Sequence, residues 1–310
     1  VGTNPIVPVI PFRHVRNSWM VEMIVNIQLA FTDWDLTVVE CSLEGNCLPS
    51  TALLYSASFC WISNPKFPKD NYKWNESGVD IVLVDKNDEN GKQTESQINK
   101  EYNNSVTFLK GDVSVKTDNI KAVETAIKVY GKLDIICANA GIYPLTWIKD
   151  ISEKEWDLVM NVNLKGPFFL LQSALDHFIQ NKYGKVIFTS SITGTSVSAS
   201  GHAHYAATKS GLLGLVKTGA VELSQYNINI NAIVPGNVMS EGMQFERGDE
   251  YIKSQSRSIP LGRLAETNEI GNLVSFLASD ESSYITGQGI IIDGGQTAPE
   301  NQDEVFHPKN

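Results

Sequence analysis

The sequence predicts an α/β fold, a doubly wound parallel sheet in a single domain that follows an atypical amino-terminal segment. Two observations predict it: short apolar, β-branched runs recur from Gly78 onward, and the stretches between them are long enough for helices. Strands that are buried on both faces and alternate with helices are typical of a parallel sheet covered on both sides.

Six strands and at least three helices follow from this rhythm. The expected strands span residues 80–84, 106–109, 133–137, 185–188, 228–234 and 289–292. The expected helices span residues 119–130, 152–180 and 205–224.

Residues 1–77 differ in composition from the rest of the chain. They hold 10 of the 28 aromatic residues, four of the six tryptophans and only two of the 23 glycines, and six prolines interrupt any periodic pattern. We therefore divide the chain into an atypical segment over 1–77, foreign to the domain or disordered in part, an α/β domain over 78–296, and a tail over 297–310.

Composition and charge limit the classes of function. The 310 residues (34.2 kDa) are 42% hydrophobic and carry a net charge of −10, which excludes a disordered chain and argues against a nucleic-acid or anionic-membrane partner. No apolar run reaches the roughly 20 residues that a membrane-spanning helix needs. The four cysteines form neither a disulfide framework nor a pair with zinc-ligand spacing, so we expect no metal and a cytoplasmic location.

Four polar residues are candidates for chemistry. Tyr205 and Lys209 lie four residues apart on an expected helix, so the ammonium shares a face with the phenol and is expected to lower its pKa toward working pH. Such a tyrosine suits general acid or base catalysis. Ser191 follows the 185–188 strand at the sheet edge where α/β folds bind ligands, and Asn163 lies inside an expected helix. A surface pair and a solvated helix face are the ordinary alternatives.

A set of motifs runs in order through residues 78–296. They are ANAG over 138–141, NLKG with Asn163, SSITG with Ser191, YAATK from Tyr205 to Lys209, VPGNVMS over 234–240, and a glycine-rich ending over 286–295. Each is weak alone, but together they resemble the short-chain dehydrogenase/reductase family. The resemblance implies a Rossmann-like fold and an NAD(P)-dependent oxidoreductase that interconverts a secondary alcohol and a ketone.

The resemblance also implies a role for each matching catalytic residue. Tyr205 would exchange a proton with the substrate oxygen, and Ser191 would hydrogen-bond that oxygen. Lys209 would lower the tyrosine pKa and hold the nicotinamide ribose, while Asn163 would hold a water that connects Lys209 with solvent.

Cofactor contacts are implied for a second, overlapping set. It comprises Asp85, Asp112, Val113, Asn139, Ala140, Gly141, Tyr205, Lys209, Pro235, Gly236, Val238 and Ser240. Within it, Asn139 would mainly tie neighbouring strands together. Asp85 ends an expected strand, where a carboxylate accepts both adenosine-ribose hydroxyls and repels a 2′-phosphate, so NAD is favoured over NADP. Lys86 and Lys92 would weaken that preference, so NADP remains an alternative cofactor.

The chain departs from the family at its start. The family opens with a strand, a glycine-rich turn of the form TGxxxGxG and a helix whose amino end binds the pyrophosphate, whereas this chain has no glycine between Gly45 and Gly78. We expect residues 51–57 to fill the slot of that strand, because an empty slot would leave buried backbone groups unpaired. Three interpretations remain: a foreign segment, a diverged start, or a protein that lacks normal dinucleotide binding and acts by association.

Substrate and assembly are less constrained. Sugars, polyols, small ketones, steroids and 3-oxoacyl thioesters fit the family, and a polar lid expected over 239–260 argues against steroids. His202 and His204 precede Tyr205, either in contact with substrate or as exposed loop residues. The family usually forms homotetramers or homodimers, which implies pairing through the helices over 152–180 and 205–224.

Overall fold

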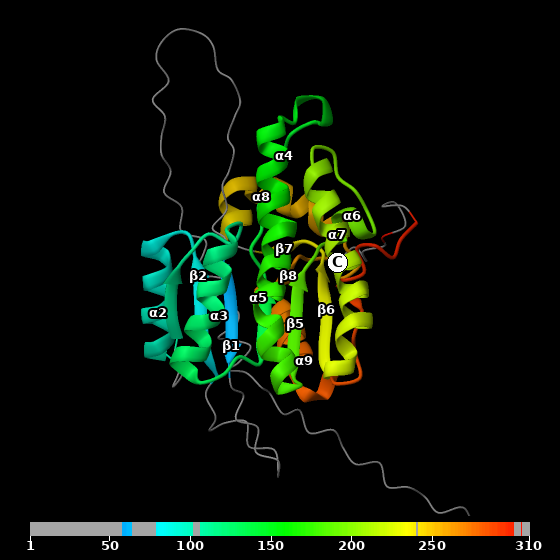
Figure 1. Ribbon diagram of the computed structural model, residues 1–310. Coiled ribbons are helices and arrows are strands. Elements are labelled where there is room, and N and C mark those ends of the chain that lie inside the picture. Colours follow the sequence, from blue (N-terminus) through cyan, green and yellow to red (C-terminus); the bar gives the residue numbers. More distant parts are fainter. Residues whose placement is uncertain (1–57, 64–78, 102–105, 240, 301–304, 306–310) are drawn as a thin grey trace, which may run out of the picture.

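A computed structural model describes residues 58–63, 79–101, 106–239, 241–300 and 305 (Figure 1). Its main sheet has seven strands in the order β3-β2-β1-β4-β5-β6-β9. Their bounds are β1 Ser58–Ser63, β2 Asp80–Asp85, β3 Val106–Lys110, β4 Ile135–Ala138, β5 Gly184–Thr189, β6 Ile228–Pro235 and β9 Gly289–Ile292. The short strands β7 (Val238–Met239) and β8 (Ala265–Glu266) form a second sheet.

Helices cover both faces of the main sheet. Their bounds are α2 Asp88–Glu101, α3 Lys116–Tyr130, α4 Glu153–Met160, α5 Gly166–Asn181, α6 Ile192–Thr195, α7 Ala203–Leu223, α8 Glu241–Arg257 and α9 Thr267–Ala278. Single turns complete the fold: Ile148–Asp150, Asn161–Lys165, Ser224–Tyr226 and Asp280–Ser282. In the residues the structure describes, no helix is both long enough and apolar enough to cross a membrane.

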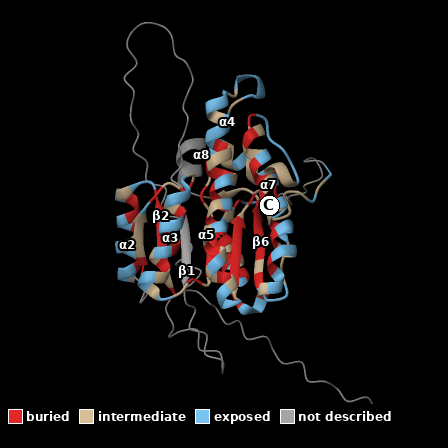
Figure 2. Ribbon diagram, viewed as in Figure 1, coloured by how far each residue is buried: buried red, intermediate tan, exposed pale blue. Residues whose placement is uncertain are grey.

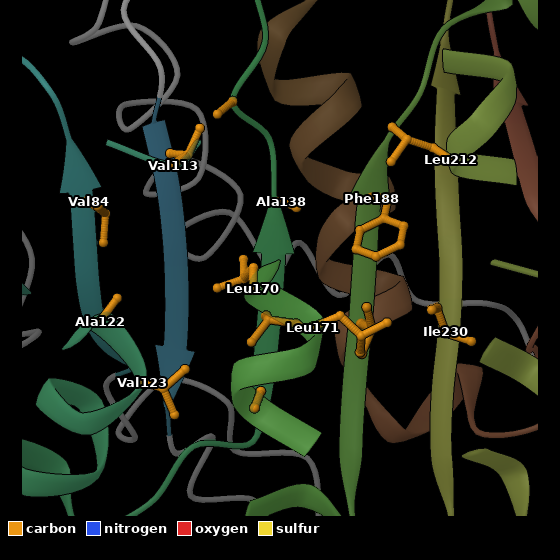
Figure 3. Close-up of a cluster of buried hydrophobic side chains, with 14 of the residues drawn as sticks. Val84, Val113, Ala122, Val123, Ala138, Leu170, Leu171, Phe188, Leu212 and Ile230 are labelled. Carbon is orange, nitrogen blue, oxygen red and sulfur yellow. The ribbon is translucent and has the colours of Figure 1, made fainter. Parts of the chain in front are cut away.

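The core consists of two apolar layers, one on each side of the sheet. Successive side chains of a strand point to opposite faces, so Val82 of β2 packs in one layer and its neighbours Ile81 and Leu83 pack in the other. The first layer joins the sheet to α3, α5 and α7 (Figure 3), and the second joins it to α2 and α9. In Figure 2 the strands β2 and β6 are largely buried, which confirms the expectation of burial on both faces for these two strands. The edge strands β3 and β9 are less buried than we expected.

Strand β1 fills the central slot but runs against its neighbours. It pairs antiparallel with both β2 and β4, and its arrow points opposite to theirs in Figure 3. The other six strands are parallel to one another. The doubly wound fold is therefore confirmed with one reversed strand. Residues 58–63 occupy this slot, so our expectation that 51–57 would fill it is wrong. Residues 51–57 lie outside the described residues, as do 1–50 and 64–78.

The helix expected over 152–180 is interrupted. Helix α4 ends at Met160, a π turn spans Asn161–Lys165, and α5 continues from Gly166. The π turn widens the backbone by one residue and turns Asn163 inward, where its side chain is fully buried. The solvated helix face that we weighed for this residue is thus wrong.

Candidate active site

The candidate site lies at the carboxyl ends of β4 and β5, where helix α7 begins. Asn139 follows β4, and its Oδ1 accepts a hydrogen bond from Thr189 Oγ1 at the end of β5 (2.9 Å). The Ser190 hydroxyl donates to the backbone carbonyl of Lys209 on α7 (2.7 Å). These two hydrogen bonds tie the ends of the strands to each other and to the helix that carries the candidate tyrosine.

Ser191 and Tyr205 meet at this edge. Ser191 is the N-cap of α6, with its Oγ accepting from the backbone N–H of Thr193 (3.1 Å). A hydrogen bond with the Ser191 hydroxyl lowers the pKa of Tyr205, but burial of the phenol has the larger effect and raises that pKa to about 12. The direction is opposite to the one we expected from the Tyr205–Lys209 spacing, because desolvation disfavours the phenolate.

Lys209 is buried on the same face of α7. Its Nζ lies 5.5 Å from the centre of the Tyr205 ring and donates to the backbone carbonyl of Thr189 (2.6 Å). Burial lowers the pKa of Lys209 to about 8. The amine is therefore close to the tyrosine, as its spacing predicts, and loses its charge only slightly above neutral pH.

Asn163 connects the π turn with the loop after β4. Its Oδ1 accepts from the backbone N–H of Ile142 (2.8 Å) and its Nδ2 donates to the carbonyl of the same residue (2.7 Å). A Cβ atom placed on Gly141 would lie 3.5 Å from Lys209 Nζ and 3.6 Å from Asn163 Oδ1. The bare glycine therefore borders both side chains, and the Asn163 amide is used to hold the loop.

Two aromatic side chains flank the Tyr205 ring. Tyr143 and His202 each meet it edge-on, with ring centres 6.1 Å and 6.0 Å from that of Tyr205. His204 is different from the expected loop histidine: it lies in the first turn of α7 and is fully buried. Sequence reasoning missed Tyr143, although its place two residues after ANAG, at the ligand edge, was a usable signal.

The expected adenosine end is occupied by local contacts. Asp85 is fully buried at the end of β2, and its Oδ1 accepts from the backbone N–H of Asn87 (2.6 Å). Asp112 accepts from Lys86 Nζ (3.0 Å) and from the Ser114 hydroxyl (2.6 Å). Burial raises the pKa of Asp112, but these hydrogen bonds outweigh it and leave the pKa below its ordinary value.

The remaining expected cofactor residues are spread along the same edge. Val113 and Ala140 are buried, Pro235 ends β6, and Val238 lies in β7. The Gly236 N–H donates to the carbonyl of Ile292 (3.0 Å), which ties the loop after β6 to the end of β9. Ser240 lies outside the described residues, and helix α8 forms most of the expected lid.

A dinucleotide fits one half of this edge better than the other. Ser191, Tyr205, Lys209 and Gly141 leave a polar cradle without a side chain on the glycine, which suits a nicotinamide ribose. The first residue of β1, Ser58, lies opposite Asp85 at the ligand edge. The strand therefore runs away from the ligand edge and ends opposite Asp80, at the other edge of the sheet. Within the described residues, no turn after β1 reaches the ligand edge to bind a pyrophosphate.

Comparisons with known proteins agree with the motifs. A family model described as "Enoyl-(Acyl carrier protein) reductase" matches residues 72–297. The chain belongs to the short-chain dehydrogenase/reductase family. It is an oxidoreductase family whose members act on CH–OH groups with NAD(P).

Three relatives illustrate the match. The oxidoreductase UcpA of Salmonella typhimurium is 36% identical over 231 residues, 72% of this chain and 87% of its own. A trans-4-hydroxycyclohexanecarboxylate dehydrogenase of Sinomonas cyclohexanicum is 37% identical, over 72% of this chain and 85% of its own. A gluconate 5-dehydrogenase of Burkholderia cenocepacia, solved with NADP and tartrate, superposes with a TM-score of 0.66 at 27% identity and covers 70% of this chain and 85% of that one.

Proposed function

We propose that this protein interconverts a secondary alcohol and a ketone on a small molecule with NAD or NADP. One observation carries the proposal: the buried phenol of Tyr205 interacts with the Ser191 hydroxyl beside the buried amine of Lys209, at the edge of the sheet where α/β folds bind ligands. Three such groups are what proton transfer to a carbonyl oxygen requires, namely a donor, a second hydrogen bond and a positive charge.

The protonation states favour the direction of reduction in the free protein. With its pKa raised to about 12, Tyr205 carries its proton at neutral pH and can donate it to a carbonyl oxygen as hydride arrives at the carbon. Ser191 donates to the same oxygen and stabilises its growing charge. Hydride chemistry would come from NAD or NADP when it is bound. Lys209, protonated below a pH of about 8, would hold the ribose and would stabilise the phenolate that remains.

The relatives and the residues at the end of β2 narrow the choice of substrate and cofactor. The trans-4-hydroxycyclohexanecarboxylate that names one relative is a secondary alcohol, which supports a small alcohol or ketone as substrate. The Asp85 carboxylate at the end of β2 would repel a 2′-phosphate, which supports NAD, whereas the NADP in the gluconate 5-dehydrogenase structure supports NADP. Exposed apolar side chains on α4 and α5, among them Trp156 and Phe168, support a homodimer or homotetramer that pairs these helices.

Titration of the purified protein with NADH and NADPH, followed by nicotinamide fluorescence, tests the proposal together with a panel of ketones and alcohols. We expect saturable binding and turnover of at least one ketone. Binding of neither cofactor at millimolar concentration, with no turnover, would contradict it.

Two observations favour a second function. The central strand β1 is reversed, and the sequence before β2 lacks the glycines of a pyrophosphate turn. Both features support a family-derived protein without normal dinucleotide binding that acts by association. The same titration separates the two functions, since only the enzyme binds the reduced nicotinamide.

A further inference from the structure

Helix α7 begins at the candidate catalytic tyrosine without an ordinary cap. The first backbone N–H groups of a helix have no partner inside the helix, and a Ser, Thr, Asp or Asn at the N-cap usually accepts one of them. Here the N-cap is His202, whose side chain makes no such hydrogen bond. Tyr205 is the third residue of the helix, so its N–H is one of the groups that need an acceptor from elsewhere.

His204 supplies that acceptor. Its Nδ1 lies 3.0 Å from the backbone nitrogen of Tyr205 and accepts the N–H. A neutral imidazole has one donor and one acceptor nitrogen, so the ring proton is on Nε2. His204 Nε2 lies 2.9 Å from Glu155 Oε1 on α4 and donates to that carboxylate. A fully buried polar ring with both nitrogens paired is held in one orientation.

The Glu155 carboxylate contacts His204 instead of capping α4, the helix to which Glu155 belongs. It is the third residue of α4, and Ser152 is the N-cap, a spacing that predicts a reciprocal capping box. Only half of the box is present: the Glu155 N–H donates to Ser152 Oγ (3.2 Å). Among the described contacts, the Glu155 carboxylate instead reaches across 49 positions of sequence to His204.

We infer that His204 and Glu155 form a positioning pair that fixes the first turn of α7, and with it Tyr205, against α4. Neither residue exchanges a proton with substrate. His204 acts through the amide of Tyr205, and Glu155 acts by selecting the ring tautomer whose Nδ1 can accept that amide. The inference deepens the proposed function, on which its kinetic part rests.

Three variants test the pair: Glu155→Gln, His204→Ala and the double variant. A matched control is His177→Ala, because Nε2 of His177 also accepts a backbone N–H, that of Leu133 (3.0 Å), ahead of β4 at the opposite edge of the sheet. The measurements are kcat, KM and the NADH dissociation constant, with the thermal midpoint of unfolding. Proton exchange at the Tyr205 amide is followed in ¹⁵N-tyrosine-labelled protein, its signal assigned by its loss in Tyr205→Phe.

We expect kcat to fall about tenfold in His204→Ala and about threefold in Glu155→Gln, while KM and the NADH dissociation constant change less than about twofold. The double variant should be no slower than His204→Ala, since the two residues act as one unit. Exchange at the Tyr205 amide should be faster in all three. His177→Ala should lower the thermal midpoint without changing kcat or this exchange.

The pair is overturned if both single variants keep kcat and amide exchange within about twofold of the parent, or if His177→Ala slows turnover equally. Should His204→Ala fail to fold, Glu155→Gln decides, because it keeps the side-chain volume. A parent protein without turnover would contradict the proposed function, and the amide exchange would still test the positioning pair.

Discussion

The two halves of the ligand edge differ in how they are built. Around β4, β5 and α7, hydrogen bonds join Asn139 to Thr189 and Asn163 to Ile142, and they place Tyr205 beside Ser191. Around β1 and β2, the polar groups contact one another and the central strand is reversed. A sheet accepts a strand of either direction, because both pairings satisfy the backbone. A ligand site at the strand ends depends on strand direction, because the direction decides which residues lie at that edge of the sheet.

The largest effect should come from the catalytic half. Tyr205→Phe removes the proton donor and keeps the ring, so turnover should fall by about 10³-fold while NADH fluorescence still reports binding. Tyr183→Phe is the control, since its hydroxyl bonds Asp280 (3.1 Å) far from the site. If Tyr205→Phe kept more than about a tenth of the parent rate, another group would be the donor.

The next effect is on stability. Asn163→Ala leaves the N–H and the carbonyl of Ile142 unpaired in the interior, where Asn163 is fully buried, and should lower the free energy of unfolding by about 3 kcal/mol. Asn161→Ala, in the same π turn, removes only a contact with exposed Lys165 and should cost less than about 0.5 kcal/mol. Urea unfolding measures both, and equal losses would rule out a special role for the Asn163 amide.

Tyr205, Asn163 and His204 show how much of the candidate site the sequence could predict. The strands, the order of motifs and the meeting of Tyr205 with Ser191 follow from spacing, because period and position along a strand are local properties. The π turn at Asn163 and the partner of His204 do not, since each depends on residues far away in the chain: Ile142 and Glu155. The sign of the Tyr205 pKa shift was wrong because spacing gives proximity to an amine but not the burial of both groups.

A pH profile sharpens the description of Lys209. Because burial lowers its pKa from 10.5 to about 8, the ammonium is present below that pH and is lost above it. Ketone reduction should therefore fall about tenfold between pH 7 and 9, and Lys209→Met should abolish this pH dependence. The folded protein also binds fewer protons than the unfolded chain between pH 8 and 10.5, so this group's contribution to stability rises with pH there. A flat profile through pH 9 would contradict the assignment.

The smallest effect concerns the other half of the edge. Asp85 is buried against its own loop, Asp112 is bound to Lys86, and β1 runs away from the ligand edge, so we expect the adenosine and pyrophosphate to add little affinity. We expect reduced nicotinamide mononucleotide to bind within about tenfold of NADH, which corresponds to at most about 1.4 kcal/mol from the missing half. ADP-ribose should compete poorly with either ligand in the fluorescence titration. Strong competition by ADP-ribose would mean that the amino-terminal half binds the cofactor by a route independent of strand direction, and the contrast between the two halves would then disappear.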